Sequence, residues 1–440
     1  MRHTSFAKST WFFLLALAIG IIISLTTCRK SKTVSHAIFT KPATEFNREL
    51  ALLSFDGARE TASKEDAEIF ATERMHFDTV QASPDYESDP TPDSIGYVFS
   101  HGAVGDYELI AVMIRGFDYG AEWAGNFHMG KTDDHEGFSR AAEKVYAGLK
   151  DYISAHFADK PLKLWISGYS RAGAVANVLS QRILSRDDID VTQENMFVYT
   201  IEAPQGLTEA HAEAYPNVFN IINSADIVPA IAPNAYGLRR CGIDKDIYRS
   251  DIDELMQKAE HPIPAFVPVS EDDAIWFFKA DTEQEFVSGL LERLMEHPLV
   301  VYPGFGDRES YAETVEDSLC YIIELATSLS SDNRQELIGA FKEFLNNLFS
   351  TKEDDFIAAL NSAVMQNNAF YIKVMEILSR NDIPYESGRL QRAFWTTIQL
   401  ILSKIDLISG CTIYADNLKR LSEMHNPTLI RTLLEQYEEK

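Results

Sequence analysis

The chain is poor in positive charge and in repeated sequence. Among its 440 residues, 40 Lys and Arg stand against 66 Asp and Glu, which leaves a formal net charge of −26. Such a charge repels nucleic-acid phosphates and favours a soluble, weakly self-associating protein, so we expect no nucleic-acid partner. The sequence has no internal repeat of fixed period and no extended low-complexity tract, which argues against a repeat architecture.

The hydrophobic content, in contrast, is ordinary. Hydrophobic residues make up 45% of the sequence, which is the proportion of a globular protein with a sizeable core. A chain of this length holds one large domain or two ordinary ones. The composition therefore predicts a folded protein but says little about a substrate.

The N-terminal segment differs from everything after it. Arg2 and Lys8 precede an apolar run over residues 11–25, and the segment ends at Cys28. This pattern resembles a bacterial lipoprotein signal, which implies cleavage before Cys28 and a lipid on its sulfur. The alternative is an uncleaved anchor, but the run is at the short limit for a bilayer span and basic residues flank it on both sides. Either way we expect an exported, membrane-tethered protein of the cell envelope, with residues 1–28 as signal or anchor and a polar tether over 29–44.

The chain has only 4 cysteines. If Cys28 carries a lipid, Cys241, Cys320 and Cys411 remain, an odd number that cannot form a complete disulfide framework. We expect at most one bridge among these three, and the sequence leaves open whether Cys320 meets Cys411.

The most informative stretch is LKLWISGYSRAGAVANVL at residues 162–179. Its first part is an apolar run of strand length that ends at Gly168, and its last part has the apolar stripe of a helix. Ser170 lies between them, where small neighbours let the strand and helix backbones approach closely, as a nucleophile elbow requires. The usual G-x-S-x-G pattern has Gly where this chain has Ala172. Because such a pentapeptide is common by chance, the strand before it and the helix after it are what favour the elbow.

Strands and helices alternate around this stretch. Further strands are predicted over residues 95–101, 107–115, 196–201 and 218–222, and helices over 45–59, 138–157 and 208–215. The first two strands are expected to form a hairpin joined by residues 102–106, with loops at 82–93 and 117–137. This alternation predicts a mainly parallel sheet covered on both faces. Ligands of such sheets bind at the carboxyl ends of strands, where Ser170 and Asp226 both fall.

The chain becomes helical from about residue 251. Helices are predicted over residues 313–328, 332–350, 354–365, 370–378, 389–407 and 413–424. We therefore expect a core domain over residues 45–250, a helical cap region over 251–424, and a C-terminal helix over 425–440.

A catalytic serine needs a base, a carboxylate that holds the base, and donors for the oxyanion. Asp226 directly follows a strand, which places it near the elbow, although capping a turn is the alternative role. His425 is our candidate base, because Asn426 can cap the next helix and Pro427 can begin it. His261 and His297 are the runners-up, and each also fits a structural role at a helix end.

The chain order of these three residues also carries information. Ser170, Asp226 and His425 follow one another in the order found in α/β-hydrolases. The backbone N–H groups of Arg171, directly after the serine, and of Phe117, in the loop after the earlier strand, are the candidate oxyanion donors. Phe117 could equally be a buried loop aromatic.

These segments together resemble the class 3 lipase family, the fungal-lipase-like α/β-hydrolases, and more closely its bacterial branch. The likeness is carried by IRG at 114–116 with EWAGN at 122–126, HEGF at 135–138, the elbow within 165–178, EAP at 202–204 with the segment 223–229, and HNPTLIRTLL from His425.

The resemblance implies an α/β-hydrolase fold, with a mainly parallel sheet flanked by helices and a C-terminal helical cap insertion. It implies hydrolysis of carboxylic esters of lipids without a metal or an organic cofactor, so a lipid or small ester is the expected substrate. By position, Ser170 would be the nucleophile, Asp226 the acid and His425 the base, with Phe117 and Arg171 as backbone oxyanion donors. The helical region would shape an apolar acyl site and act as a lid.

The chain departs from the family pattern in three ways. Many members have Thr or Ser where Phe117 stands, which leaves only its N–H for an oxyanion, and Ala172 replaces a glycine of the elbow. The span from Asp226 to His425 is long and requires an insertion.

Two rival functions remain open: a phospholipase or acyltransferase on the same site, and a non-catalytic envelope protein that keeps the hydrolase scaffold and binds a partner. The natural ester, its chain length and the oligomeric state are not determined by the sequence.

Overall fold

The computed structural model describes residues 36–117, 119–157, 160–231, 234–257, 263–271, 278–296, 306–350, 369–403, 407, 410 and 413–438. The signal or anchor segment, His261, His297, Cys411 and the helix expected over 354–365 lie outside the described residues. The described residues form two compact units. We call residues 36–263 with 423–438 the sheet unit, and residues 264–422 the helical unit.

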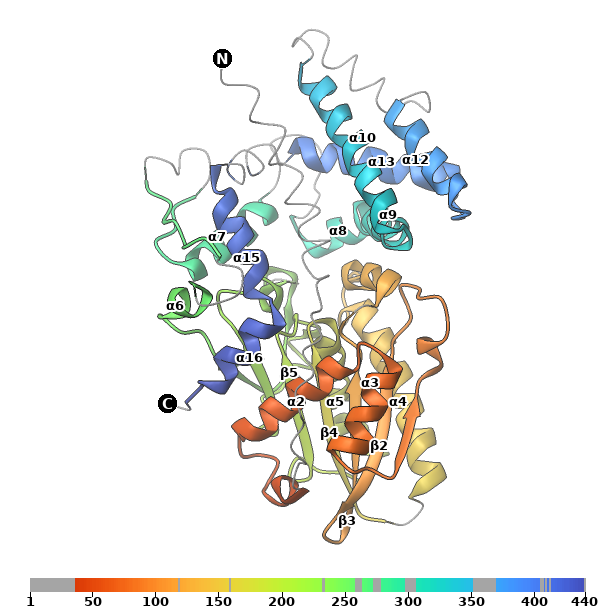
Figure 1. The fold of residues 1–440 in the computed structure, drawn as a ribbon, viewed down its shortest axis with the longest axis vertical. Coiled ribbons are helices and arrows are strands. Elements are labelled where there is room, and N and C mark those ends of the chain that lie inside the picture. The colour runs from red at the N-terminus through yellow and green to blue at the C-terminus, as the bar shows by residue number, and fades with distance from the viewer. Residues whose placement is uncertain are drawn as a thin grey trace. The chain divides into compact units, whose positions relative to one another are not determined.

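A seven-stranded sheet forms the centre of the sheet unit (Figure 1). In spatial order its strands are β1 (Thr79–Ala82), β2 (Tyr97–Val104), β3 (Tyr107–Ile114), β4 (Leu162–Tyr169), β5 (Met196–Ile201), β7 (Val218–Ile222) and β9 (Ile243–Asp246). The pairs β1–β2 and β2–β3 are antiparallel, whereas every pair from β3 to β9 is parallel. A second, antiparallel pair consists of β6 (Leu207–Thr208) and β8 (Leu238–Arg239).

Helices cover both faces of this sheet. All eight residues of β4 are buried, with Leu164 and Ile166 in the core on one face and Trp165 in the core on the other. The first core includes α4 (Glu136–His156) and α5 (Arg171–Arg186), and the second includes α2 (Arg48–Glu60) and α16 (Pro427–Glu435) (Figure 1). A strand buried on both sides needs a mostly apolar sequence, and β3 and β4 are both mostly apolar. The predicted α/β-hydrolase fold is therefore confirmed.

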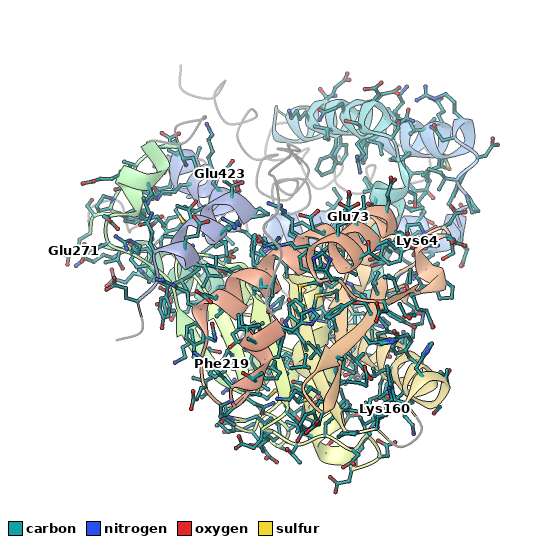
Figure 2. The ribbon with its side chains drawn as sticks, turned by 60° about the horizontal axis from the view of Figure 1, so that its bottom comes forward. Lys64, Glu73, Lys160, Phe219, Glu271 and Glu423 are labelled. Carbon is teal, nitrogen blue, oxygen red and sulfur yellow. The ribbon has the colours of Figure 1, made fainter. Side chains whose placement is uncertain are left out.

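The shorter elements of the sheet unit connect these layers. They are η1 (His36–Thr40), α3 (Lys64–Ile69), η2 (Phe70–Arg74), η3 (Pro84–Tyr86), η4 (Gly120–Phe127), η5 (Val228–Ala230), η6 (Asn234–Tyr236) and α6 (Ile252–Gln257). In Figure 2, Lys64 and Lys160 lie at the surface of this unit, whereas Phe219 is one of its buried core residues.

Residues 36–43 belong to the sheet unit and pack against its core, although they fall within the stretch expected to be a polar tether. Phe39 is completely buried and lies edge-on to Phe197, with ring centroids 5.4 Å apart. The Lys163 ammonium donates to the Phe39 carbonyl at 2.8 Å. A free tether therefore does not extend over these residues.

The helical unit has its own hydrophobic core. Its helices are α7 (Glu283–Met295), α8 (Arg308–Thr314), α9 (Glu316–Ser328), α10 (Ser331–Ser350), α12 (Ala369–Arg380), α13 (Ser387–Ser403) and α15 (Ala415–Met424), the last of which ends in the sheet unit. Buried residues of α9, α10, α12 and α13, such as Phe344 and Phe394, form one cluster. No helix among the described residues is long and apolar enough to cross a membrane.

Three local predictions were wrong. The helix expected over 208–215 is not formed. Thr208 instead pairs with Leu238 in the small sheet and donates its N–H to the Asp134 carboxylate at 2.8 Å. The loop expected over 117–137 contains the 3-10 helix η4. The hairpin connection is shorter than expected, since β2 runs on to Val104 and the chain reverses at Gly105, which has a φ of 62°.

Candidate active site

Ser170 lies at a sharp turn between β4 and α5. Its φ of 56° and ψ of −125° are strained for a residue with a side chain. The neighbouring backbones are in close contact, because a Cβ on Gly168 would lie 2.3 Å from the Ala172 carbonyl oxygen. The predicted strand, turn and helix are therefore confirmed, and the geometry is that of a nucleophile elbow.

Three polar side chains from distant parts of the sequence meet at this turn. The Nε2 atom of His425 lies 2.9 Å from the Oγ of Ser170, and its Nδ1 atom lies 2.5 Å from the Oδ2 of Asp226. Ser170 follows β4, Asp226 follows β7, and His425 directly precedes the Asn426 cap of α16. All three side chains are buried. This is the hydrogen-bond order of a nucleophile, a base and an orienting carboxylate.

The His425 backbone is fixed from several directions. Asn426 caps α16 by accepting the Thr428 N–H at 2.9 Å, and Pro427 begins the helix, as the sequence predicted. The Tyr169 hydroxyl donates to the His425 carbonyl oxygen, and the Tyr169 ring lies 5.0 Å from the imidazole. The Asn223 side-chain amide donates to the Met424 carbonyl at 3.3 Å. These contacts hold the imidazole in place relative to the end of β4.

An ion-pair cluster fastens α16 to α2. Asp56 on α2 lies 2.9 Å from Arg431 on α16 and 2.6 Å from Arg74. Burial alone would raise the pKa of Asp56, but the hydrogen bonds and charges of Arg431 and Arg74 outweigh it and lower this pKa below its usual value. Ile430 and Leu434 of α16 pack in the same core as α2. The candidate base His425 therefore lies next to a helix that is held by both apolar packing and ion pairs.

The loop that carries Asp226 is organised by its own hydrogen bonds. The Asp226 N–H donates to the Asn223 carbonyl at 2.9 Å, and Asp226 Oδ1 accepts the Val228 N–H at 2.9 Å. Oδ2 is thereby left for His425. The carboxyl of Glu202, at the end of β5, lies beside Asp226, and burial and the charge of Asp226 raise the pKa of Glu202 well above its usual value.

The two expected oxyanion donors flank the elbow. Arg171 is the first residue of α5, so its N–H has no acceptor within the helix. The Phe117 ring stacks on Tyr169, with centroids 4.6 Å apart and ring planes at 12°. A Cβ on Gly116 would lie 2.1 Å from the Tyr169 carbonyl oxygen, so only glycine allows the loop after β3 to approach the elbow this closely. Both interpretations of Phe117 thus fit, since it is partly buried and lies next to the elbow.

The side chain of Arg171 is buried and supports the loop in front of the elbow. Its guanidinium donates to Asn126 Oδ1 at 3.1 Å and to the Ser94 carbonyl at 3.4 Å. Glu122 forms an ion pair with Arg115. Burial raises the pKa of Glu122 to about 7, although the nearby charges of Arg115 and Arg171 lower it. The EWAGN stretch therefore supports the loop after β3.

Sequence reasoning did not assign roles to Tyr169, Glu202 and Asn223, although all three contact Asp226 or the His425 segment. Two signals were available: Tyr169 is the second residue of the elbow pentapeptide, and Glu202 directly follows a buried strand.

Cys241 is fully buried, and burial raises the pKa of its thiol to about 12, so it is not a reactive thiol.

Among the described residues of the sheet unit, Glu202, Asp226 and His425 lie close enough to hold a metal ion, with ligand atoms within 4.8 Å of one another. Both ring nitrogens of His425 already lie at hydrogen-bond distance from Ser170 and Asp226. A metal on this group would have to break those hydrogen bonds. The arrangement therefore fits proton transfer better than metal binding.

On this α/β-hydrolase scaffold, the geometry makes Ser170, His425 and Asp226 a candidate serine-hydrolase site. Comparison with known protein families shows that residues 110–236 match the model of the class 3 lipases. The matched segment contains β4, the Ser170 turn and Asp226, and ends before His425. The matched segment is less than half of the chain. No curated protein matches the chain.

Several solved lipase structures are similar in part. A fungal lipase in complex with an inhibitor is 16% identical, with 48% of this chain and 81% of that chain covered and a TM-score of 0.37. The Rhizomucor miehei triacylglyceride lipase is 19% identical, with 46% and 80% covered and a TM-score of 0.36. Lipase II from Rhizopus niveus is 16% identical, with 50% and 84% covered and a TM-score of 0.35. Likenesses of this size carry no weight by themselves.

Proposed function

We propose that the protein is a serine-dependent hydrolase of carboxylic esters, in which Ser170, His425 and Asp226 form the catalytic triad. The observation that carries the proposal is the pair of hydrogen-bond distances, 2.9 Å from Ser170 to His425 and 2.5 Å from His425 to Asp226, at a strained elbow. The class 3 lipase match over residues 110–236 supports lipase-type ester hydrolysis.

Each group has a defined role in the proposed reaction. His425 Nε2 takes the proton of Ser170 as its Oγ attacks the ester carbonyl, and Asp226 stabilises the imidazolium that forms. The backbone N–H groups of Arg171 and Phe117 stabilise the oxyanion. His425 then gives its proton to the departing alcohol. Water activated by His425 hydrolyses the acyl-enzyme and restores Ser170.

We further propose that the substrates are acyl esters of lipids and that the protein works at a membrane. The class 3 lipase match supports the first part, and the lipoprotein-type pattern ending at Cys28 supports the second. A lipid acyl chain also needs an apolar binding surface, because the polar groups of the triad bind only the ester itself.

Turnover of p-nitrophenyl esters of increasing acyl length tests this proposal. We expect hydrolysis by the wild type, a preference for the longer acyl chains, and loss of at least about 10³-fold in kcat/KM for Ser170→Ala. Equal turnover by wild type and Ser170→Ala would contradict the proposed nucleophile. Product analysis with phospholipid and with an added alcohol separates a lipase from a phospholipase or an acyltransferase.

A further inference from the structure

Glu202 is a buried acidic residue that the proposed reaction does not use. It directly follows β5, its side chain is fully buried, and its φ is 49°. Its backbone N–H donates to the Ile221 carbonyl at 2.8 Å, which fixes it between β5 and β7. A left-handed φ and a buried carboxyl both disfavour Glu, and glycine would suit the backbone better. The side chain must therefore contribute something that offsets these costs.

The Glu202 carboxyl lies against Asp226. One carboxylate oxygen of Glu202, one of Asp226 and one ring nitrogen of His425 lie within 4.8 Å of one another. Other groups facing Glu202 are the Tyr169 hydroxyl and the Arg240 guanidinium. Arg240 is occupied elsewhere, since it donates to the Ala203 carbonyl at 3.0 Å and pairs with Asp244 at 2.8 Å. Ionising both of two buried carboxyls this close together is unfavourable without a cation between them.

The hydrogen bonds decide which carboxyl keeps the proton. Asp226 Oδ1 accepts the Val228 N–H at 2.9 Å and Oδ2 faces His425, so both of its oxygens are in contact with donors. Both oxygens of Glu202 face a single donor, the Asn223 N–H, at 2.9 and 3.2 Å. Donors favour the charged form of the carboxyl that they contact. Asp226 is therefore the ionised partner and Glu202 the neutral one.

We propose that Glu202 is a positioning residue of the candidate active site: its neutral carboxylic acid donates a hydrogen bond to the Asp226 carboxylate and fixes the orientation in which Asp226 holds His425. This inference rests on the proposed function of the triad. Glu202 touches no reacting atom and acts only through Asp226. Its second oxygen accepts the Asn223 N–H, so one side chain connects the ends of β5 and β7.

Two substitutions separate this role from a purely structural one. Glu202→Gln keeps the shape, and its amide can donate to Asp226 and accept from Asn223 as a neutral acid does. We expect it to keep kcat within about threefold, with the acidic limb of the kcat/KM pH profile unmoved, because no charge beside His425 changes. Glu202→Gly suits the backbone but removes the donor, so we expect kcat to fall about tenfold or more with KM within about twofold.

The ionisation state is tested without activity by urea unfolding at several pH values. If Glu202 is neutral in the folded protein and ionises on unfolding, the free energy of unfolding falls as the pH rises above the pKa of Glu202 in the unfolded chain. Gln at this position does not ionise and causes no such fall. The unfolding midpoint of Glu202→Gln should therefore exceed that of the wild type by an amount that grows from pH 5 to pH 8. A difference that stays constant with pH would overturn the neutral Glu202.

The activity measurements complete the test. Full kcat in Glu202→Gly, or a shifted acidic limb in Glu202→Gln, would overturn the positioning role. A wild type that neither hydrolyses esters nor reacts with a serine-directed probe would instead overturn the proposed function, while the unfolding comparison would still decide the state of Glu202.

Discussion

Ser170 has a backbone conformation that residues with a side chain rarely adopt. Asp226 and His425, which complete its hydrogen-bond chain, are far apart in the sequence. His425 completes the hydrogen-bond chain with Asp226 although 199 residues separate the two. Ser170 and Glu202 both have positive φ, and both lie at carboxyl ends of parallel strands. Strain at these positions is consistent with functional constraint.

Replacing the base is the first residue-scale prediction. His425→Ala should reduce kcat/KM by about three orders of magnitude or more, because Ser170 then has no proton acceptor. Steady-state ester hydrolysis measures the loss. His211→Ala is a matched control, since His211 is paired with Asp134 at 2.9 Å and should keep near-normal activity. The runners-up His261 and His297 should likewise tolerate Ala, and an inactive His297→Ala with an active His425→Ala would transfer the role.

The Tyr169 hydroxyl gives a second residue-scale prediction. Tyr169→Phe keeps the ring against His425 but removes its donor to the His425 carbonyl, so we expect a roughly threefold to tenfold loss of kcat and a stability loss of about 1 kcal/mol. Kinetics and urea unfolding measure the two effects. Tyr152→Phe loses a comparable hydrogen bond, to His101 at 2.7 Å, and should lower stability without changing kcat. Equal kcat in the two variants would contradict the positioning of His425 by Tyr169.

At the scale of elements, α16 matters most because His425 directly precedes it. The helix has few residues, Pro427–Glu435, so its stability depends on packing and on the Asp56 cluster more than on helix propensity. Anything that loosens α16 from α2 should therefore affect both stability and turnover.

The Asp56 cluster predicts a pH-dependent contribution to stability. Because the folded pKa of Asp56 is below the unfolded value of about 3.9, its ion pairs stabilise the protein fully above about pH 4, and this stabilisation is lost as the pH falls through the folded pKa. Asp56→Asn should cost about 1 to 3 kcal/mol at pH 7 and less at pH 3. Urea unfolding at both pH values measures the difference.

Glu435 provides the control for this cluster. It pairs with the same Arg431 but is exposed, so Glu435→Gln should cost less than about 1 kcal/mol at pH 7. A larger loss for Glu435→Gln than for Asp56→Asn would show that the buried pairing is not what holds α16.

Element prediction succeeded where periodicity and burial agree. The strands β5 and β7 have the predicted bounds, because nearly all of their residues are apolar and buried. The helix expected over 208–215 failed because partners distant in sequence, Leu238 and Asp134, take the hydrogen bonds of Thr208. Local pattern contains no information about such partners.

At the scale of the whole molecule, the sequence indicated which residues would meet but not what holds them. Ser170, Asp226 and His425 could be proposed from turn chemistry and chain order alone. The support from Tyr169, Asn223 and Glu202 could not, since it consists of contacts between β-strand ends and the chain before α16. Contacts of this kind become visible only when the chain is folded.

The central claim is that Ser170 is an activated nucleophile, and labelling with a fluorophosphonate probe tests it most directly. The probe bonds covalently to a serine only where a neighbouring base activates the hydroxyl. We predict stoichiometric labelling of the wild type, mapped by peptide mass spectrometry to Ser170, none in Ser170→Ala, and strongly slowed labelling in His425→Ala. An unlabelled wild type, or equal labelling of Ser170→Ala, would contradict the account.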